Sequence, residues 1–207
     1  MKAWNELADS GSVERCVKAL GANGMQAWSV ESAAEAMAKT LDLLPQGAEV
    51  FTMSSVTIES MGLARKVNES PHYVSVRKKL EAMDSKTQAH AMKVIGAIPD
   101  YALGSVHAAT EQGTLLVASN TGSQLPAYSY TAEMLILIIG AQKIVASAEE
   151  GLRRINEYIV PLESVRAREA YGLPDTWHTF PSKILTINRE LHPGRIKIFI
   201  VNEVLGF

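Results

Sequence analysis

Cysteine is nearly absent from this sequence, because Cys16 is the only one among 207 residues. A single thiol excludes a disulfide within the chain and every structural zinc site that takes two or more thiolates from it. Disulfides form and persist in oxidising compartments, so a chain this poor in cysteine fits a reducing one. We therefore expect a cytoplasmic protein.

Long hydrophobic runs are also absent. The most apolar run, residues 134–139, is far shorter than a membrane-spanning helix, which needs about 20 residues. No continuous apolar segment precedes Asp9 and Glu14, so nothing resembles a secretory signal. We expect a protein that does not associate with a membrane.

Neither sign of charge dominates the chain. Lysine and arginine total 20 against 22 acidic residues, which gives a formal net charge of -2 at pH 7. This balance provides no overall field that would attract nucleic acid or an anionic membrane. Basic runs at 65–66, 77–79 and 153–154 lie in helix-like stretches, and we interpret them as solvated helix faces. We expect no nucleic-acid partner.

The motifs of several enzyme classes are missing. The sequence contains neither a G-x-x-x-x-G-K-[ST] loop for nucleoside triphosphates nor the G-x-S-x-G nucleophile turn of many hydrolases. The five histidines are scattered, without H-x-x-x-H or H-E-x-x-H spacing. We predict no bound catalytic metal.

The chain does contain alternating strand-like and helix-like periods. Short apolar stretches between polar loops predict strands at 25–30, 49–53, 101–103, 114–118 and 135–139. Two further strands, 184–187 and 196–201, flank a His-Pro-Gly turn and predict a terminal hairpin. Capping boxes that begin at Ser32 and Ser147 predict helix starts. Residues 74–95 predict a long helical region broken near Asp84, with Ser85 capping its second half.

This alternation predicts an α/β fold with an open, mixed and mostly parallel sheet and helices on both faces. The composition, with 47% hydrophobic and 20% charged residues, is that of one ordinary globular domain. We therefore treat residues 1–207 as a single domain, with a helical N-terminal portion at 1–45 and the core at 46–207.

A turn rich in hydroxyl groups follows the strand expected at 49–53. Ligands of such sheets bind just beyond the carboxyl ends of the strands. Ser54, Ser55 and Thr57 lie there, at the start of a helix whose free amides and dipole favour a phosphate or carboxylate. Simple capping of the helix by Ser55 or Thr57 explains the same residues equally well. Both interpretations stay open.

Two polar loops, 104–114 and 119–124, bracket the short strand expected at 114–118. Glu111 precedes a glycine turn and suits a nucleophile or general base, although an ordinary turn carboxylate fits the spacing as well. His107 can exchange a proton near neutral pH, but a lone histidine is more often structural. Lys143 and Arg189 follow expected strands, where their positive charges could pair with an anionic ligand. Each could equally be an ordinary charge on a helix surface or loop.

Three segments of the chain, 54–62, 100–124 and 134–155, resemble the LUD domain, the family of the lactate-utilization proteins. The most specific block is Ala109-Thr110-Glu111-Gln112-Gly113-Thr114, with Thr121-Gly122-Ser123 behind it. The likeness extends over most of the chain from about residue 45.

The resemblance implies a fold similar to that of ribose-5-phosphate isomerase, glucosamine-6-phosphate deaminase and the coenzyme A transferases. It also implies a part in the oxidation of lactate or a related organic acid to pyruvate, beside iron–sulfur redox proteins. One cysteine cannot supply the four thiolates of a cluster. We therefore expect no cofactor on this chain alone, and an iron–sulfur cluster only in a partner protein.

Residue chemistry and the resemblance together define the candidate site. The candidate catalytic residues are Glu111 and His107. The candidates for binding a small carboxylate or phosphate are polar or glycine residues of the resembling segments: Ser54, Ser55, Thr57, Glu59, Gly113, Thr121, Gly122, Ser123 and Lys143. We expect the hydroxyl turn and the Glu111 loop to meet in one cleft.

Two other functions stay open at this point. One is a stand-alone sugar-phosphate isomerase or coenzyme A transferase-like enzyme that uses Glu111. The other is a ligand-sensing module without catalysis. A homo-oligomer is compatible with the sequence in each case.

Overall fold

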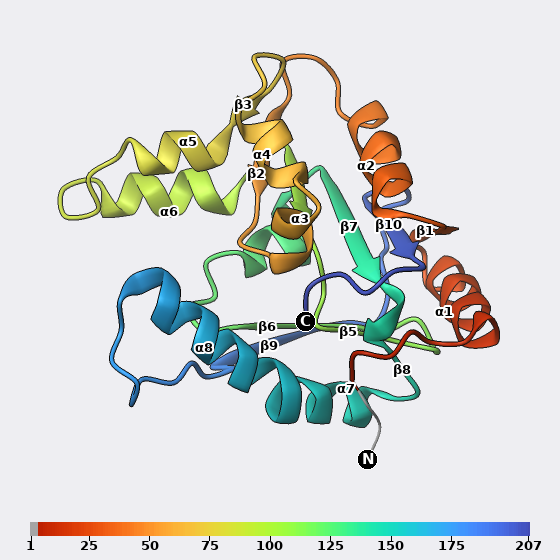
Figure 1. The fold of residues 1–207 in the computed structure, drawn as a ribbon. Coiled ribbons are helices and arrows are strands. Elements are labelled where there is room, and N and C mark those ends of the chain that lie inside the picture. Colours follow the sequence, from red (N-terminus) through yellow and green to blue (C-terminus); the bar gives the residue numbers. More distant parts are fainter. Residues whose placement is uncertain (1–3) are drawn as a thin grey trace.

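The computed structural model describes residues 4–207. Within this range, six parallel strands form the main sheet in the order β1-β10-β7-β4-β2-β3 (Figure 1). In that order the strands are Gln26–Val30, Ile196–Val201, Met134–Gly140, Tyr101–Gly104, Glu49–Thr52 and Val74–Ser75. The sheet is open and its pairings are parallel, as the alternation of strands and helices predicts.

Strand β7 lies inside the sheet and is covered on both faces. Leu135, Leu137 and Ile139 belong to one apolar cluster, whereas Ile136 and Ile138 belong to another on the opposite face. Successive residues of a strand alternate between the two faces. A strand that is buried on both sides therefore carries consecutive apolar residues, which is the pattern that the sequence shows.

Helices cover both faces of the main sheet, as predicted. On one face lie α2 (Ala33–Asp42), α3 (Val56–Ser60) and α4 (Leu63–Asn68). On the other face lie α1 (Ser10–Ala22), α5 (Val76–Glu81) and α6 (Ala89–Ala97). Within residues 4–207, no helix combines the length and apolarity needed to cross a membrane.

A second sheet packs against the same face as α1. Its strand order is β8-β5-β6-β9, and the strands are Ile144–Val145, Ala108–Thr110, Leu115–Ser119 and Lys183–Ile187. Leu115 and Val117 of β6 join the apolar cluster beneath the main sheet, whereas Leu116 points to the other side.

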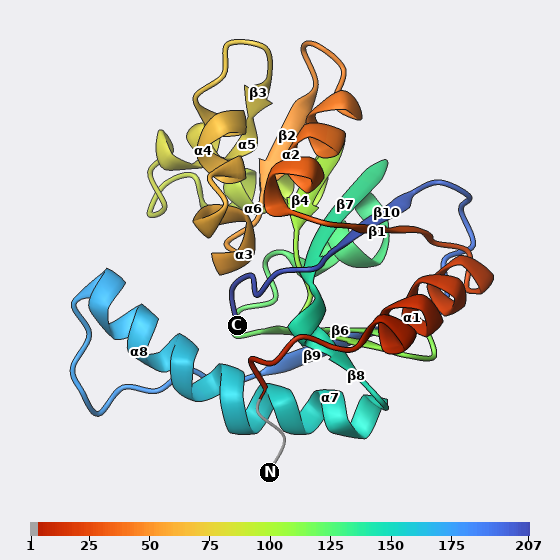
Figure 2. The same cartoon turned by 45° about the vertical axis from the view of Figure 1, so that its right-hand side comes forward.

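A long helical run covers the outer face of this second sheet. It consists of α7 (Ala148–Arg154), a π-helical turn at Ile155–Ile159 and α8 (Val160–Tyr171). Figures 1 and 2 show the second sheet between the main sheet and this run. The second sheet and α8 thus form a wall facing the carboxyl ends of the main strands.

The terminal hairpin expected at 184–201 is wrong. β9 pairs with β6 in the second sheet, whereas β10 lies between β1 and β7 in the main sheet. The loop between them is fixed by a buried ion pair, in which Arg195 Nε donates to Glu190 Oε2 over 2.6 Å. This loop therefore carries the chain from one sheet to the other rather than turning it back.

Some local expectations are confirmed and others are not. Ser32 accepts a hydrogen bond from the Glu35 amide, and Ser147 from the Glu150 amide, so both predicted capping boxes start helices. The helical region expected at 74–95 is broken near Asp84 as predicted, because α5 ends at Glu81 and α6 begins at Ala89. It opens with the short strand β3, however, and α6 follows Gln88 rather than a Ser85 cap. The portion before residue 46 is not only helical, because β1 pairs with β10 in the main sheet.

Candidate functional site

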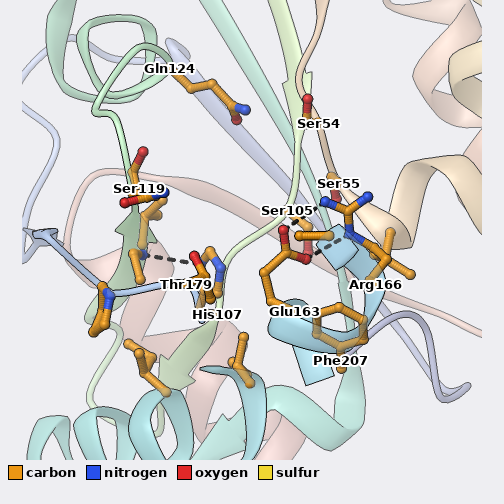
Figure 3. A pocket seen from close by; sticks show the side chains of 18 of the residues that line it. Ser54, Ser55, Ser105, His107, Ser119, Gln124, Glu163, Arg166, Thr179 and Phe207 are labelled. Carbon is orange, nitrogen blue, oxygen red and sulfur yellow. Dashed lines mark hydrogen bonds and ion pairs between the residues drawn. The ribbon is translucent and has the colours of Figure 1, made fainter. Parts of the chain in front are cut away.

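A cavity of about 510 Å³ lies at the carboxyl ends of β2, β4 and β7. These three strands are neighbours in the main sheet, so the segments that follow them meet at one edge. The opposite wall comes from β6, the loop after it, α8 and the segment 177–181. Figure 3 shows Ser54 and Ser55 across the cavity from Ser119. The hydroxyl turn therefore faces a cavity, as predicted.

The side chain of Lys143, which follows β7, is buried in the cavity wall. Its Nζ donates to Thr57 Oγ1 over 2.8 Å and to Ser105 Oγ over 3.2 Å. Only 3% of the residue is exposed, although it lines the cavity. Burial, helped by the positive charge of Arg154, lowers the pKa of this amine to about 7. Lys143 thus exists partly as a neutral amine near neutral pH.

Arg154 is a second buried cation near this end of the cavity. Its Nη1 donates to the His107 carbonyl over 2.6 Å, and burial lowers its pKa to about 10. Among the described residues, no carboxylate lies within ion-pair distance of Arg154 or Lys143. The two groups leave uncompensated positive charge in a buried environment.

The expectation that Arg154 lies on a solvated face is wrong. Arg153 does face solvent, where it pairs with Glu157 one turn along the helix. The next residue in a helix points about 100° further round, and this turns Arg154 toward the second sheet. It is fully buried there, with its guanidinium over the ring of Tyr158.

His107, which lies beyond β4, also lines the cavity. Its Nδ1 accepts a hydrogen bond from the Ala118 amide over 3.1 Å. Burial, with smaller effects of Lys143 and Arg154, lowers its pKa to about 3. The imidazole is therefore neutral, and its proton lies on Nε2 because Nδ1 is an acceptor. Near neutral pH this side chain suits a hydrogen-bond donor better than a base.

Arg77 contributes a guanidinium that the sequence did not single out. Its Nη2 donates to the Thr52 carbonyl over 2.8 Å and to Ser54 Oγ over 3.0 Å. The residue lines the cavity, so the interpretation of its basic run as a solvated face is wrong at this position. Its neighbours do face outward, since Lys78 is exposed and Lys79 pairs with Glu49. No sequence pattern separates Arg77 from these lysines.

An ion pair on α8 lines another part of the cavity (Figure 3). Arg166 and Glu163 form two parallel hydrogen bonds of 2.7 Å each. The bonds to Glu163 raise the pKa of Arg166, and its guanidinium lies over the ring of Tyr171. Because Glu163 compensates the positive charge of Arg166, Arg166 attracts an anionic ligand less strongly than Lys143 or Arg77.

The residues of the hydroxyl turn have separate roles. Ser54 is exposed and accepts the bond from Arg77, whereas Thr57 is buried and donates to the Leu205 carbonyl over 3.1 Å. Ser55 occupies the capping position of α3, but its side chain makes no capping bond. α3 spans five residues, so the side chains of this turn matter more than a helix dipole.

The remaining anion-binding candidates lie at the edge of the cavity or in its loops. Glu59, Thr121 and Ser123 line the cavity and are exposed. Gly122 does not line it, but adopts φ of +86° in the loop between Thr121 and Ser123. This left-handed conformation favours glycine, so Gly122 shapes the loop rather than contacting a ligand.

The expectation that Glu111 shares this cavity is wrong. Its carboxylate accepts hydrogen bonds from Arg15 Nε over 2.8 Å and Nη2 over 3.0 Å, and these bonds lower its pKa. Gly113, at φ of +79°, packs against the backbone of Ala19 and Leu20 in α1. Neither Glu111 nor Gly113 lines the cavity, because the turn after β5 points to α1 while His107 lies at the other end of that strand.

The side chains do not fit an iron–sulfur cluster. Cys16 is fully buried, and burial raises the pKa of its thiol to about 12, far from that of a thiolate ligand. In the described part of the chain, no three His, Cys, Asp or Glu side chains gather closely enough to hold a metal ion. Arg189, the other cation expected beyond a strand, is exposed and lies outside the cavity.

We predict that Lys143→Met removes a specific pH dependence of stability. In the unfolded chain the amine titrates near 10.5, and in the folded chain at about 7. Between these values the unfolded state binds more protons, so the free energy of unfolding of the wild type gains a contribution that rises with pH. That contribution disappears in Lys143→Met and persists in Lys78→Met, an exposed control.

The measurement is urea unfolding of the three proteins at neutral pH and at about pH 9.5, read as the difference from the wild type. The same pH dependence in Lys143→Met and in the wild type would show that the folded amine titrates normally.

Comparisons with known proteins agree with this architecture. The family model described as LUD domain matches residues 13–201. A solved structure of a DUF162 family protein from Deinococcus radiodurans shares 16% sequence identity, with a TM-score of 0.57, over 95% of this chain and all of that one. At this identity the likeness supports the fold alone. A comparison with curated proteins found no match. Because the family model spans most of the sequence, the chain belongs to the LUD domain family, which is associated with lactate utilization.

Proposed function

We propose that this protein takes part in the utilization of lactate or a related organic acid, and that its cavity binds the carboxylate of that acid. The observation that carries the proposal is the uncompensated positive charge at the strand ends. Lys143 and Arg77 line the cavity there and meet hydroxyl and carbonyl groups, and Arg154 adds a buried positive charge behind the wall. No carboxylate among residues 4–207 pairs with any of the three.

Arg77 is the best anchor for the carboxylate itself. Its guanidinium carries a fixed positive charge, and because Thr52 and Ser54 accept both N–H bonds of Nη2, Nε and Nη1 are the donors left for a carboxylate. The hydroxyls of Ser54 and Ser55 add donors on the same wall. A small acid held by Arg77 then extends toward the buried wall that contains Lys143 and His107.

The groups at that wall suit the oxygen on the second carbon of a 2-hydroxy or 2-oxo acid. Neutral His107 presents Nε2–H as a donor, and Lys143 offers an amine near its pKa of about 7. These two groups can form hydrogen bonds with the oxygen both when it is a hydroxyl and when it is a carbonyl. Neither group is a strong acid or base. The cavity of about 510 Å³ exceeds a three-carbon acid, so it also admits a larger relative or part of a partner.

The alternative of an isomerase or transferase that uses Glu111 has no support in the geometry. The carboxylate lies outside the cavity and is held by Arg15. A nucleophile needs access to its substrate, and this one is at the far end of β5.

Ligand binding tests the proposal. L-lactate, pyruvate or a related small acid should stabilise the wild type, by about 2.7 kcal/mol at a hundredfold excess over its Kd. Arg77→Met should weaken binding by about ten- to a hundredfold, because it removes charge-assisted hydrogen bonds. The control Lys78→Met should bind as the wild type does, since that side chain is exposed.

Calorimetric titration and melting temperature read out the affinity. Glu111→Gln serves as a second control and should leave the affinity unchanged. Equal affinities of Arg77→Met and the wild type, or a large loss in Glu111→Gln, would contradict the proposed site.

We also propose that iron–sulfur partner proteins carry the electrons of the oxidation. The donors of this chain do not fit a cluster, and a 2-hydroxy acid must lose two electrons to become a 2-oxo acid. Pull-down from native extract under reducing conditions should therefore recover iron–sulfur proteins with this chain. Recovery of the chain without any redox protein would contradict this part of the proposal.

A further inference from the structure

The hydrogen bonds around Lys143 leave one position on its nitrogen for a ligand. Thr57 Oγ1 gives its own hydrogen to the Leu205 carbonyl over 3.1 Å, and Ser105 Oγ gives its hydrogen to the Val106 carbonyl over 3.4 Å. Both hydroxyls therefore act as acceptors toward Lys143 Nζ. In the neutral amine, these two acceptors take both N–H bonds and leave the lone pair of Nζ free.

The two acceptors are held firmly. Thr57 is 1% exposed and Ser105 is 6% exposed. Tyr128 OH donates to the Ser105 carbonyl over 2.6 Å, which fixes the backbone beside the amine. The nitrogen is therefore held by two fixed acceptors, and the residue that carries it lines the cavity.

The amine is also reactive at neutral pH. Burial lowers the pKa of Lys143 to about 7, so far more of this amine is neutral at that pH than of an exposed lysine. No carboxylate of residues 4–207 pairs with the amine and holds it protonated. Burial that withholds the charge is a recognised way of turning a lysine into a nucleophile toward carbonyl carbon.

We propose that Lys143 forms an imine with the carbonyl carbon of a 2-oxo acid bound in the cavity. The choice of a 2-oxo acid rests on the proposed function, because it is the oxidised form of a 2-hydroxy acid. The imine itself rests on the arrangement of Lys143, Thr57 and Ser105 at the cavity wall.

The step balances without an oxidant or a reductant. The lone pair of Nζ attacks the carbonyl carbon, and the resulting carbinolamine loses its oxygen as water. Overall, one lysine ammonium and one carbonyl compound give one iminium ion and one water. Two nitrogen hydrogens leave with the oxygen, and the third stays on nitrogen, where Thr57 or Ser105 can accept it. The Nε2–H of neutral His107 is a donor for the departing oxygen.

The arrangement also separates the two oxidation states of the ligand. A 2-hydroxy acid has no carbonyl carbon that an amine can attack, so it binds without a covalent bond. A 2-oxo acid is retained by a covalent but reversible bond. The site would therefore hold the oxidised acid longer than the reduced one.

Reductive trapping tests this inference. The wild-type protein is incubated near pH 7 with pyruvate and sodium cyanoborohydride, and its intact mass and peptide map are measured. We expect one reduced pyruvate adduct per chain, located at Lys143, while exposed lysines such as Lys78 remain mostly unlabelled. L-lactate should give no adduct, and Lys143→Met should give none with pyruvate.

The peptide map of the wild type keeps the test independent of whether Lys143→Met folds. Pyruvate that stabilises the protein without labelling Lys143, or labels it no faster than exposed lysines, would overturn the imine and leave the proposed function intact. Absence of both stabilisation and labelling with every small acid would overturn both.

Discussion

The burial of one amine without a counter-charge is the constraint on which this site depends. Moving an ammonium from water into a protein interior costs several kcal/mol unless a partner compensates it. Lys143 meets two hydroxyls instead of a carboxylate, and Arg154 adds a further positive charge nearby. The site lowers this cost by letting the amine lose its proton or by binding an anion.

The fold explains how this burial is achieved. Strands β2, β4 and β7 are neighbours, so the segments that carry Thr57, Ser105 and Lys143 leave the main sheet at one edge. In open α/β sheets, ligands bind just outside this edge. Here the second sheet and α8 stand opposite it and enclose the space (Figure 2). The helical run from α7 to α8 also carries Arg154, which adds its charge from the outer layer.

Much of the fold follows from local patterns in the sequence. The consecutive apolar residues of β7 predict a strand covered on both faces, and the capping boxes at Ser32 and Ser147 locate two helix starts. Pairing between strands distant in sequence is not a local property. For this reason the turn between β9 and β10 was predicted as a hairpin, although the two strands belong to different sheets.

The site divides in the same way. The hydroxyl turn and Lys143 could be predicted as site residues because both follow buried strands. In the structure both line the same cavity. Glu111 also lies in a segment that resembles the family. Its carboxylate is held outside the cavity by Arg15, which is 96 residues away in the sequence, so no local pattern shows this contact. The sequence did not single out Arg77 and Arg154, because each lies in a run of basic residues. Adjacent residues of a helix face different sides, and the residue types alone do not show which side is buried.

Direct titration of the Lys143 amine tests whether burial lowers its pKa. Protein with ¹³C-labelled lysine side chains shows one ¹³Cε signal per lysine, and the Lys143→Met spectrum assigns the signal of interest. We expect a midpoint at about 7 for Lys143 in the free protein. A midpoint close to 10.5, the ordinary value for lysine, would contradict it.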